Sequence, residues 1–384
     1  MDPWLLDPDL TYLNHGSFGA CPRPVLDQVH RWQARFEANP VAFVEETYRP
    51  ALAAARGELA GFVAADPAGL VFVRNATEGV NAVLRSIEPL LEPGDEILQT
   101  DHGYNACRNA AEVTALRTGA SVITAPLPFP VARPDEMVEA VLSKVTDRTR
   151  LAVIDHVTSP TALVLPVDRI VGELEPRVPV LVDGAHAPGM LPLKVEALGA
   201  SFYTGNCHKW LCAARGAGFL WVHEEWRDRM LPPVVSHGWN TVPEGSTRFR
   251  ELFDWTGTDD PSAWLSVPAA IRFLGSLDPA GPPAVMAANH GLVLAGRDEL
   301  ARRLAIDPPV PDPMLGSMAS LPLPGPAGAG GGGLDPLTSR LRHEHQIEVP
   351  VFRWGGRRLL RISAQRYNRV EDYQRLGEVL ARVL

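Results

Sequence analysis

The chain has 384 residues, of which 46% are hydrophobic and 21% are charged, and its formal net charge at pH 7 is -9. This length and composition indicate a soluble protein with two domains, and the acidic balance disfavours nucleic acid or an anionic membrane as a partner. The sequence contains no apolar run near the roughly 20 residues of a membrane span, and its start, MDPWLLDPDL, is acidic, so we expect a cytoplasmic protein. The four cysteines, Cys21, Cys107, Cys207 and Cys212, form no CxxC pair, which favours buried thiols and no metal site.

Short β-rich runs alternate with helical stretches between residues 70 and 222. We expect strands at LVFV, EILQT, SVIT, RLAVID, VPVLVD, FYTG and GFLWV, and helices that begin at Thr77, after Tyr104 and at Pro134. This alternation predicts an α/β fold with a largely parallel sheet and helices on both faces. Ligands in such sheets bind at the carboxyl ends of the strands.

The remainder of the chain has a different pattern. Residues 223–262 are rich in Trp, Gly and Pro and predict long loops, whereas helical periodicity returns at Val267 and across residues 284–304. The Gly- and Pro-rich stretch 321–335 predicts a flexible surface connection. After it we expect a helix near residues 335–344, strands at IEVPVF and RRLLRIS, and a final helix from Val370. We therefore predict an N-terminal segment (1–20), a large domain (21–262) and a small C-terminal domain (263–384).

Two charged residues follow neighbouring apolar runs. Asp183 ends VPVLVD, and an acid at the end of an apolar strand is costly unless a partner stabilises it. Lys209 follows the next strand-like run, so the two side chains could converge at one edge of the sheet. Together they suggest pyridoxal phosphate, whose aldehyde needs a lysine and whose ring nitrogen needs an acid. Taken singly, Asp183 could equally be a helix N-cap and Lys209 a surface lysine.

Other strand ends carry polar residues as well. The segment Asn75-Ala76-Thr77 follows LVFVR and opens a helix, where free backbone N–H groups could bind a phosphate or form a plain cap. His102 and Tyr104 follow EILQT, and one of their rings could stack on a flat cofactor or pack in the core.

Ser159 follows RLAVID and could reach the same edge of the sheet, or it could belong to a simple Ser-Pro turn.

Seven segments occur in order along the chain: YLNHGSFGACP (12–22), NATEGVN (75–81), DHGYNA (101–106), HVTSPTA (156–162), VDGAHAPG (182–189), FYTGNCHKWL (202–211) and LRISAQRYN (360–368). Taken together, they resemble the class V aminotransferase family of pyridoxal-phosphate enzymes, in its isopenicillin N epimerase-like branch. The resemblance runs from about residue 10 to the C-terminus. It implies fold type I, with a large α/β domain around a mostly parallel seven-stranded sheet, a small C-terminal domain, and a homodimer whose active site uses both subunits.

The resemblance also implies roles around the cofactor ring. Lys209 would form the Schiff base and Asp183 would pair with the pyridinium nitrogen. His186 matches a Gln or His position near the phenolic oxygen, and Ser159 matches a position where cysteine desulfurases usually have asparagine.

By the same resemblance, Tyr104 would be the stacking aromatic residue, with His102 as the alternate. The phosphate group would be held by Ala76 and Thr77 through the helix terminus, by side chains of His208 and Asn206, and by Thr258 from the other subunit.

The resemblance further places Arg361 where the family binds the α-carboxylate of the substrate, which a guanidinium group can bind through two parallel hydrogen bonds. Asn14 and His15 lie in the turn NHGSFG, which the family places near the active site. Trp354 and Arg353, and His237 and Trp239 in SHGW, could shape a pocket for the substrate side chain or lie in an interface. Ala214 and Arg215 differ from the residues that relatives often have after the lysine loop.

Three reactions share this chemistry, in which Lys209 is the expected base for the Cα proton. Reprotonation from the opposite face gives epimerisation, loss of a β-substituent gives elimination, and protonation at the cofactor carbon gives transamination. Epimerisation needs a second donor, for which His15 and His102 are candidates. The segment IEVPVFRWGGRRLL lacks the cysteine that persulfide-forming desulfurases carry, although a lyase that expels a thiol needs none.

We expect an isopenicillin N epimerase-like enzyme that acts at Cα of an L-amino acid or a derivative of one. A Cβ–S lyase and an aminotransferase are the alternatives. A cofactor-binding partner subunit without turnover is the non-enzymatic alternative, which the presence of Lys209, Asp183 and Arg361 disfavours.

Overall fold

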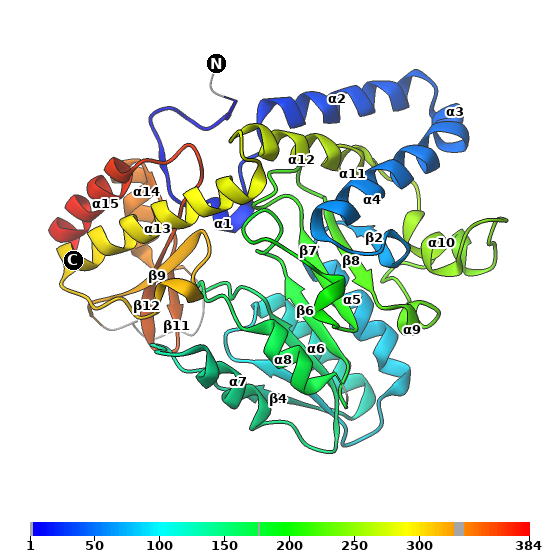
Figure 1. Ribbon diagram of the computed structural model, residues 1–384, viewed down its shortest axis with the longest axis horizontal. Coiled ribbons are helices and arrows are strands. Elements are labelled where there is room, and N and C mark those ends of the chain that lie inside the picture. The colour runs from blue at the N-terminus through cyan, green and yellow to red at the C-terminus, as the bar shows by residue number, and fades with distance from the viewer. Residues whose placement is uncertain (1–2, 176, 326–333) are drawn as a thin grey trace.

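The computed structural model describes residues 3–175, 177–325 and 334–384 of the chain (Figure 1). Its centre is a seven-stranded sheet with the order β2-β8-β7-β6-β5-β3-β4. The strands are β2 (Leu70–Val73), β3 (Glu96–Thr100), β4 (Ser121–Ala125), β5 (Thr149–Asp155), β6 (Val180–Gly184), β7 (Phe202–Asn206) and β8 (Gly218–Val222). Strands β3 to β7 pair in parallel, and β8 runs antiparallel to β2 and β7. Every run that we expected to be a strand between residues 70 and 222 contributes to this sheet.

Helices cover both faces of the sheet. Because successive side chains of a strand point to opposite faces, Leu151 and Leu181 pack with one group of helices while their neighbours Ala152 and Val182 pack with the other. The first group includes α5 (Ala76–Ile87) and α6 (Asn105–Thr118), and the second includes α7 (Pro134–Leu142) and α8 (Val167–Leu174). The sheet is therefore buried on both sides, as parallel sheets usually are.

A layer of helices from distant parts of the chain lies over one end of the sheet (Figure 1). Helix α2 (Arg23–Ala38) and helix α4 (Arg49–Val63) come from the N-terminal part, with the short helix α3 (Pro40–Ala42) and a π-helical segment (Phe43–Tyr48) between them. They pack against α11 (Ser262–Leu265) and α12 (Val267–Ser276). The predicted domain limit at 262/263 stays a prediction.

The C-terminal part is a small α/β unit. Helix α13 (Pro282–Leu304) runs from α12 to this unit and packs against α15 (Val370–Val383) (Figure 1). An antiparallel sheet with the order β11-β12-β9 completes it, built from β9 (Met318–Leu323), β11 (Val351–Trp354) and β12 (Arg357–Ser363), with α14 (Pro336–His345) before β11. The predicted helices near 335–344 and from Val370 are therefore present.

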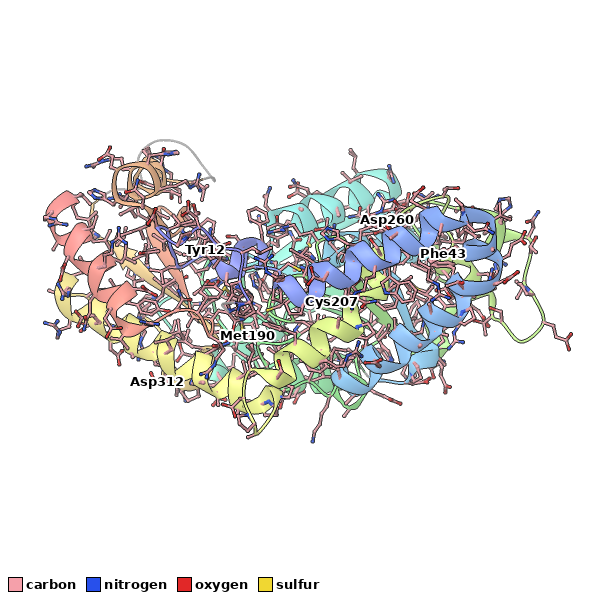
Figure 2. The ribbon with its side chains drawn as sticks, turned by 90° about the horizontal axis from the view of Figure 1, so that it is seen from above. Tyr12, Phe43, Met190, Cys207, Asp260 and Asp312 are labelled. Carbon is pink, nitrogen blue, oxygen red and sulfur yellow. The ribbon has the colours of Figure 1, made fainter. Side chains whose placement is uncertain are left out.

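The N-terminal segment joins the two parts. Strand β1 (Thr11–Tyr12) pairs in parallel with β10 (Ile347–Glu348), and α1 (His15–Phe18) follows it. In Figure 2, Tyr12 lies beside the C-terminal unit, Phe43 and Asp260 lie toward the other end, and Cys207 lies between them. The loop that carries Lys209 is thus near the middle of the molecule.

Two expectations need correction. The Gly- and Pro-rich stretch 321–335 was expected to be a flexible surface connection, but residues 321–323 belong to β9, and Leu321 is fully buried. Pro322 is tolerated because β9 is an edge strand, where a missing N–H costs no ladder hydrogen bond. Asp335 caps α14 by accepting a hydrogen bond from the backbone N of Leu337 at 3.0 Å. Residues 326–333 of the predicted connection lie outside the described residues.

The second correction concerns residues 223–262, which we expected to form long loops. They contain the short helix α9 (Glu224–Arg227) and the helix α10 (Arg248–Asp254), whose N-cap Thr247 accepts a hydrogen bond from the backbone N of Arg250 at 3.3 Å. Phe249, Leu252 and Phe253 of α10 pack in the same cluster as α5. In residues 3–175, 177–325 and 334–384, none of the helices combines the length and the apolar character needed to cross a bilayer.

Candidate active site

A cavity of about 320 Å³ opens at the carboxyl ends of β5, β6 and β7. Ligands of parallel sheets bind at this edge because the connecting loops gather there. Nine of the residues that the sequence predicted for the site line the cavity: Ala76, Thr77, Tyr104, Ser159, Asp183, His186, Asn206, His208 and Lys209. They come from five segments of the chain that are far apart in sequence.

Lys209 lies in the loop after β7 with its amine directed at a histidine. Its Nζ is 3.1 Å from Nε2 of His186. Burial and the positive charge of Arg361 lower the pKa of Lys209 to about 7, although the charge of Asp183 acts in the opposite direction. A substantial share of this amine is therefore uncharged at neutral pH and can act as a nucleophile or a base.

Two buried carboxyl groups stand side by side at this edge. Asp155 ends β5 and pairs in register with Asp183 of β6. Asp183 accepts hydrogen bonds from the backbone N of Ala185 at 3.0 Å and from the thiol of Cys107 at 3.2 Å. Burial raises the pKa of Asp183, and burial with the nearby charge of Asp183 raises the pKa of Asp155 well above its usual range. Two adjacent buried carboxylates repel each other, so the pair favours a shared proton or a neighbouring cation.

The N-terminus of α5 forms another part of the cavity wall. Asn75 caps the helix by accepting a hydrogen bond from the backbone N of Glu78 at 3.0 Å. The N–H of Ala76 donates to Oδ1 of Asn206 at 2.8 Å, so the side chain from β7 already uses one of the donors that the sequence assigned to a phosphate. Thr77 lines the cavity beside it.

The charge at this end of the cavity comes from arginines. Nδ1–H of His208 donates to the carbonyl of Ala217 at 3.2 Å, and burial lowers the pKa of His208 to about 4, so this ring is neutral at pH 7. Arg74 and Arg215 also line the cavity. Arg74 forms an ion pair with Asp259 at 2.5 Å, whereas Arg215 donates to the carbonyl of Gly19 at 3.2 Å.

Arg361 lies behind the wall and supports it. Its guanidinium donates through Nη1 to the carbonyl and hydroxyl of Ser159 at 2.7 and 3.2 Å, and through Nη2 to the hydroxyl of Ser17 at 2.9 Å. Ser17 and Ser159 themselves line the cavity. The side chain is 1% exposed, its Nε has no partner among the described residues, and burial lowers the pKa of Arg361 to about 10, at which the group is still a cation at neutral pH.

Both histidines considered as a second donor support the site from outside the cavity wall. Nε2–H of His15 donates to the carbonyl of Lys209 at 3.1 Å, and Nδ1 accepts from the hydroxyl of Tyr367 at 2.9 Å. His102 is fully buried, with Nδ1 at 2.8 Å from Oγ1 of Thr161. Burial lowers the pKa of each histidine to about 4.

Of the other aromatic and polar candidates, Tyr104 lines the cavity, whereas Trp354 and Asn14 lie outside its wall. Trp354 packs against His102 with ring centroids 4.4 Å apart, while Tyr104, 49% exposed, lies at the N-cap position of α6 and faces the cavity. Asn14 donates to Glu348 at 3.1 Å and accepts from Ser17 at 2.6 Å, which links it to the wall only through Ser17.

Residues expected near the substrate side chain or the other subunit lie farther away. Arg353 is 3.6 Å from Asp335, and Trp239 lies beneath the guanidinium of Arg248 at 4.3 Å in the turn that also holds His237. Thr258 lies in the segment between α10 and α11, next to Asp259, which pairs with a cavity arginine. None of these residues lines the cavity as described.

Among the wall residues that sequence reasoning did not assign to the site, five have polar, charged or thiol side chains: Ser17, Arg74, Cys107, Asp155 and Arg215. Asp155 carries the same signal as Asp183, an acid at the end of the apolar strand RLAVID, and could have been found. Ser17 and Arg215 lie in segments that we singled out for other reasons. Nothing in the sequence marks Cys107 or Arg74, which reach the cavity only through the packing of α6 and the entry to α5.

Comparisons with known proteins place the chain in a family. The family model for class-V aminotransferases matches residues 11–295. An isopenicillin N epimerase from Amycolatopsis lactamdurans is 38% identical over 98% of this chain and 95% of its own length, and an L-cysteine desulfhydrase from Arabidopsis thaliana is 30% identical over 97% and 87%. The solved structure of the cystine C–S lyase C-DES, with glycine covalently linked to its pyridoxal-phosphate cofactor, has a TM-score of 0.81 at 21% identity and covers 97% of both chains. The predicted fold type I architecture is thereby confirmed, and the chain belongs to the class-V aminotransferase family.

Proposed function

We propose that this chain is a pyridoxal-phosphate-dependent enzyme that acts at Cα of an L-amino acid or a derivative of one, and that it catalyses an epimerisation like that of the isopenicillin N epimerases. The observation that carries the proposal is Lys209, whose amine, with a pKa of about 7, lies in the cavity together with a pair of buried carboxyl groups. The identity of 38% to an isopenicillin N epimerase along nearly the whole chain supports the choice of reaction.

The residues around the cavity fit the cofactor. The uncharged amine of Lys209 can bond to an aldehyde, and Asp183 beside Asp155 favours a cation such as a protonated ring nitrogen. Tyr104 offers an exposed ring to stack on the cofactor, while Ser159 and His186 would contact its phenolic oxygen.

The phosphate would be held at the other end of the cavity by Thr77, Asn206 and His208, with Ala76 oriented through Asn206. Arg215 would add a positive charge there, since His208 is neutral at pH 7.

The chemistry divides between the cofactor and the chain. When bound, pyridoxal phosphate supplies an electron sink that stabilises the charge left at Cα. Lys209 removes the Cα proton, for which a pKa near the working pH is well suited. Arg361, buried with no carboxylate partner among the described residues, would bind the α-carboxylate by exchanging its hydrogen bonds to Ser17 and Ser159.

A Cβ–S lyase is the second candidate, and it is supported by the desulfhydrase relative. Lys209 and Arg361 would have the same roles in that reaction, and the difference lies in whether a thiol leaves from Cβ. All four cysteines are distant in sequence from residues 347–360, so a persulfide on that segment is not part of this candidate.

Isotope exchange separates the candidates. The holoenzyme is incubated in deuterated water with a panel of L-amino acids and cysteine S-conjugates, and Cα exchange, configuration, pyruvate and ammonia are measured. Inversion with deuterium at Cα and without pyruvate is the expected result. Release of pyruvate with a thiol would instead establish the lyase, and the absence of any exchange with every substrate would contradict both.

Absorbance tests the cofactor assignment independently of turnover. We expect the purified chain with pyridoxal phosphate to show a visible band that Lys209→Ala abolishes and that the matched variant Lys194→Ala, at an exposed lysine, retains. Asp183→Asn should keep the band and lose at least about 100-fold in activity, because an amide cannot stabilise a protonated ring nitrogen. Near-full activity of Asp183→Asn would refute the role of that carboxylate.

We also propose a homodimer with a shared site, as the sequence resemblance implies. Phe18, 66% exposed, and Tyr104 present apolar surface next to the cavity, which supports coverage by a second copy. Thr258 would reach the phosphate of the other subunit. A cytoplasmic location stays a prediction.

A further inference from the structure

Trp210, the residue after Lys209, connects to the amine through a histidine. Its indole N–H donates to Nδ1 of His186 at 3.4 Å. The other ring nitrogen of His186, Nε2, is the atom that lies 3.1 Å from Nζ of Lys209. Three side chains thus form a row from a fully buried indole to the cavity.

The direction of the first hydrogen bond determines the tautomer of His186. An indole N–H can only donate, so Nδ1 must accept and carries no hydrogen. A neutral imidazole then has its hydrogen on Nε2. If Nδ1 were protonated, its N–H would face the indole N–H with no acceptor between them. Burial, together with the charges of Lys209, Arg361 and His208, also lowers the pKa of His186 well below its usual value, so the ring stays neutral.

The tautomer in turn acts on the lysine. An Nε2–H group can donate to the lone pair of an uncharged amine, whereas an ammonium group is itself only a donor and finds no acceptor in that position. Burial and Arg361 favour the uncharged amine as well, while Asp183 and Cys107 favour the charged one.

We propose that Trp210 is a positioning residue, which holds His186 in the Nε2–H tautomer and so keeps the amine of Lys209 uncharged and oriented for bond formation. The inference rests on the proposed function in one respect: an uncharged amine is useful because cofactor attachment and proton removal both need it. Its test requires no cofactor, so it can fail or succeed separately from that function.

The composition of the chain makes the test direct. It has three lysines, Lys144, Lys194 and Lys209, and the first two are exposed. The full-length chain, freed of cofactor, is labelled with trace acetic anhydride at a series of pH values, and the modification of each lysine is quantified by mass spectrometry. We expect Trp210→Phe to raise the labelling midpoint of Lys209 by about one pH unit, from a starting pKa of about 7, which is about a fivefold loss of uncharged amine at pH 7. The midpoints of Lys144 and Lys194 should not move.

Trp221 offers a matched control. It is also a buried tryptophan, but its indole N–H has no hydrogen-bond partner among the described residues. Trp221→Phe removes a ring of the same size and should leave the Lys209 midpoint unchanged. Replacement of Trp210 by benzothienylalanine, which keeps the shape and lacks the N–H, should reproduce the shift and covers the case in which Trp210→Phe fails to fold.

A double-variant cycle separates positioning from general packing. In a His186→Leu background, Trp210→Phe or the benzothienylalanine replacement should add no further shift, because the histidine that transmits the effect is gone. An unchanged Lys209 midpoint in both Trp210 variants, or an equal shift with and without His186, would overturn the proposal.

Discussion

Single residues at the cavity combine burial with charge. Lys209 is partly exposed to the cavity, and the structure surrounds its amine with a neutral histidine, a buried guanidinium and a carboxyl pair. Each group is costly to bury alone. Together they form a set in which the amine, the carboxyl pair and the guanidinium each favour a complementary group on a ligand: an aldehyde carbon, a ring cation and a carboxylate. This complementarity is the residue-scale basis of the proposed function.

Asp155 gives a pH-dependent prediction at the same scale. Its raised pKa means that the folded chain binds a proton more tightly than the unfolded chain, so the free energy of unfolding falls as the pH rises above the usual carboxyl pKa of about 4. Asp155→Asn removes this titration. We expect the variant to gain about 1 to 2 kcal/mol relative to the parent between pH 5 and pH 8, as measured by urea denaturation of the chain without added cofactor.

The exposed Asp147 provides the control for that measurement. Asp147→Asn should follow the parent at every pH. If Asp155→Asn also keeps the pH dependence of the parent, burial beside Asp183 does not raise the pKa of Asp155 in the folded chain.

At the scale of elements, the position of α5 on β7 decides where the phosphate end of the site lies. A Cβ at Gly79 would come within 2.2 Å of Oγ1 of Thr204. The hydroxyl of Thr204 donates a hydrogen bond to the carbonyl of Phe219 at 2.8 Å, which fixes its position. Only glycine therefore allows α5 to approach the strand this closely. The N-terminal turn of the same helix lines the cavity with Ala76 and Thr77. The close contact at Gly79 therefore determines where these two residues lie.

Gly79→Ala should accordingly separate α5 from β7. We expect a loss of about 2 to 4 kcal/mol in the free energy of unfolding, from overpacking, and at least tenfold weaker binding of pyridoxal phosphate measured by fluorescence titration. The matched variant Gly57→Ala in α4 has open space around its Cβ and should instead stabilise the chain by about 0.5 to 1 kcal/mol, with unchanged affinity. Equal effects of the two variants would contradict this account of α5.

Elements also show where a sequence pattern misleads. Pro322 and its neighbours carry the composition of a loop, yet they form β9, because an edge strand needs no N–H at that position. Helix α10 lies among Trp, Gly and Pro residues and is too short for its periodicity to stand out. Packing against β2, within the core cluster that α5 shares, stabilises it.

At the scale of the whole molecule, the proposed homodimer makes a prediction that depends on both subunits. We expect a mass in solution of about twice 41.7 kDa by light scattering. If Thr258 contacts the phosphate of the other subunit, Thr258→Val should weaken cofactor binding about tenfold in the homodimer, through loss of one hydrogen bond to a charged group.

Mixed dimers test whether that contact crosses the interface. When Lys209→Ala and Thr258→Val chains are mixed and allowed to exchange, one site of each heterodimer pairs an intact Lys209 with an intact Thr258 from its partner. That site should recover parental cofactor affinity. Recovery should fail if Thr258 acts within its own chain, and Thr256→Val in the same mixture serves as the control for a nearby threonine.

By itself, the sequence determined the order of strands and helices in the large α/β part and indicated the central pair of Lys209 and Asp183, because apolar runs, breaks and a charge at the end of a strand are local signals. The family followed from the resemblance of seven motifs in order along the chain. Tertiary structure alone decided which residues meet. It brought Cys107 and Arg74 to the cavity, placed His15 and His102 behind its wall, and set Trp210 against His186. These contacts join segments separated by tens to hundreds of residues, and their geometry depends on how helices and strands pack, which no local pattern records.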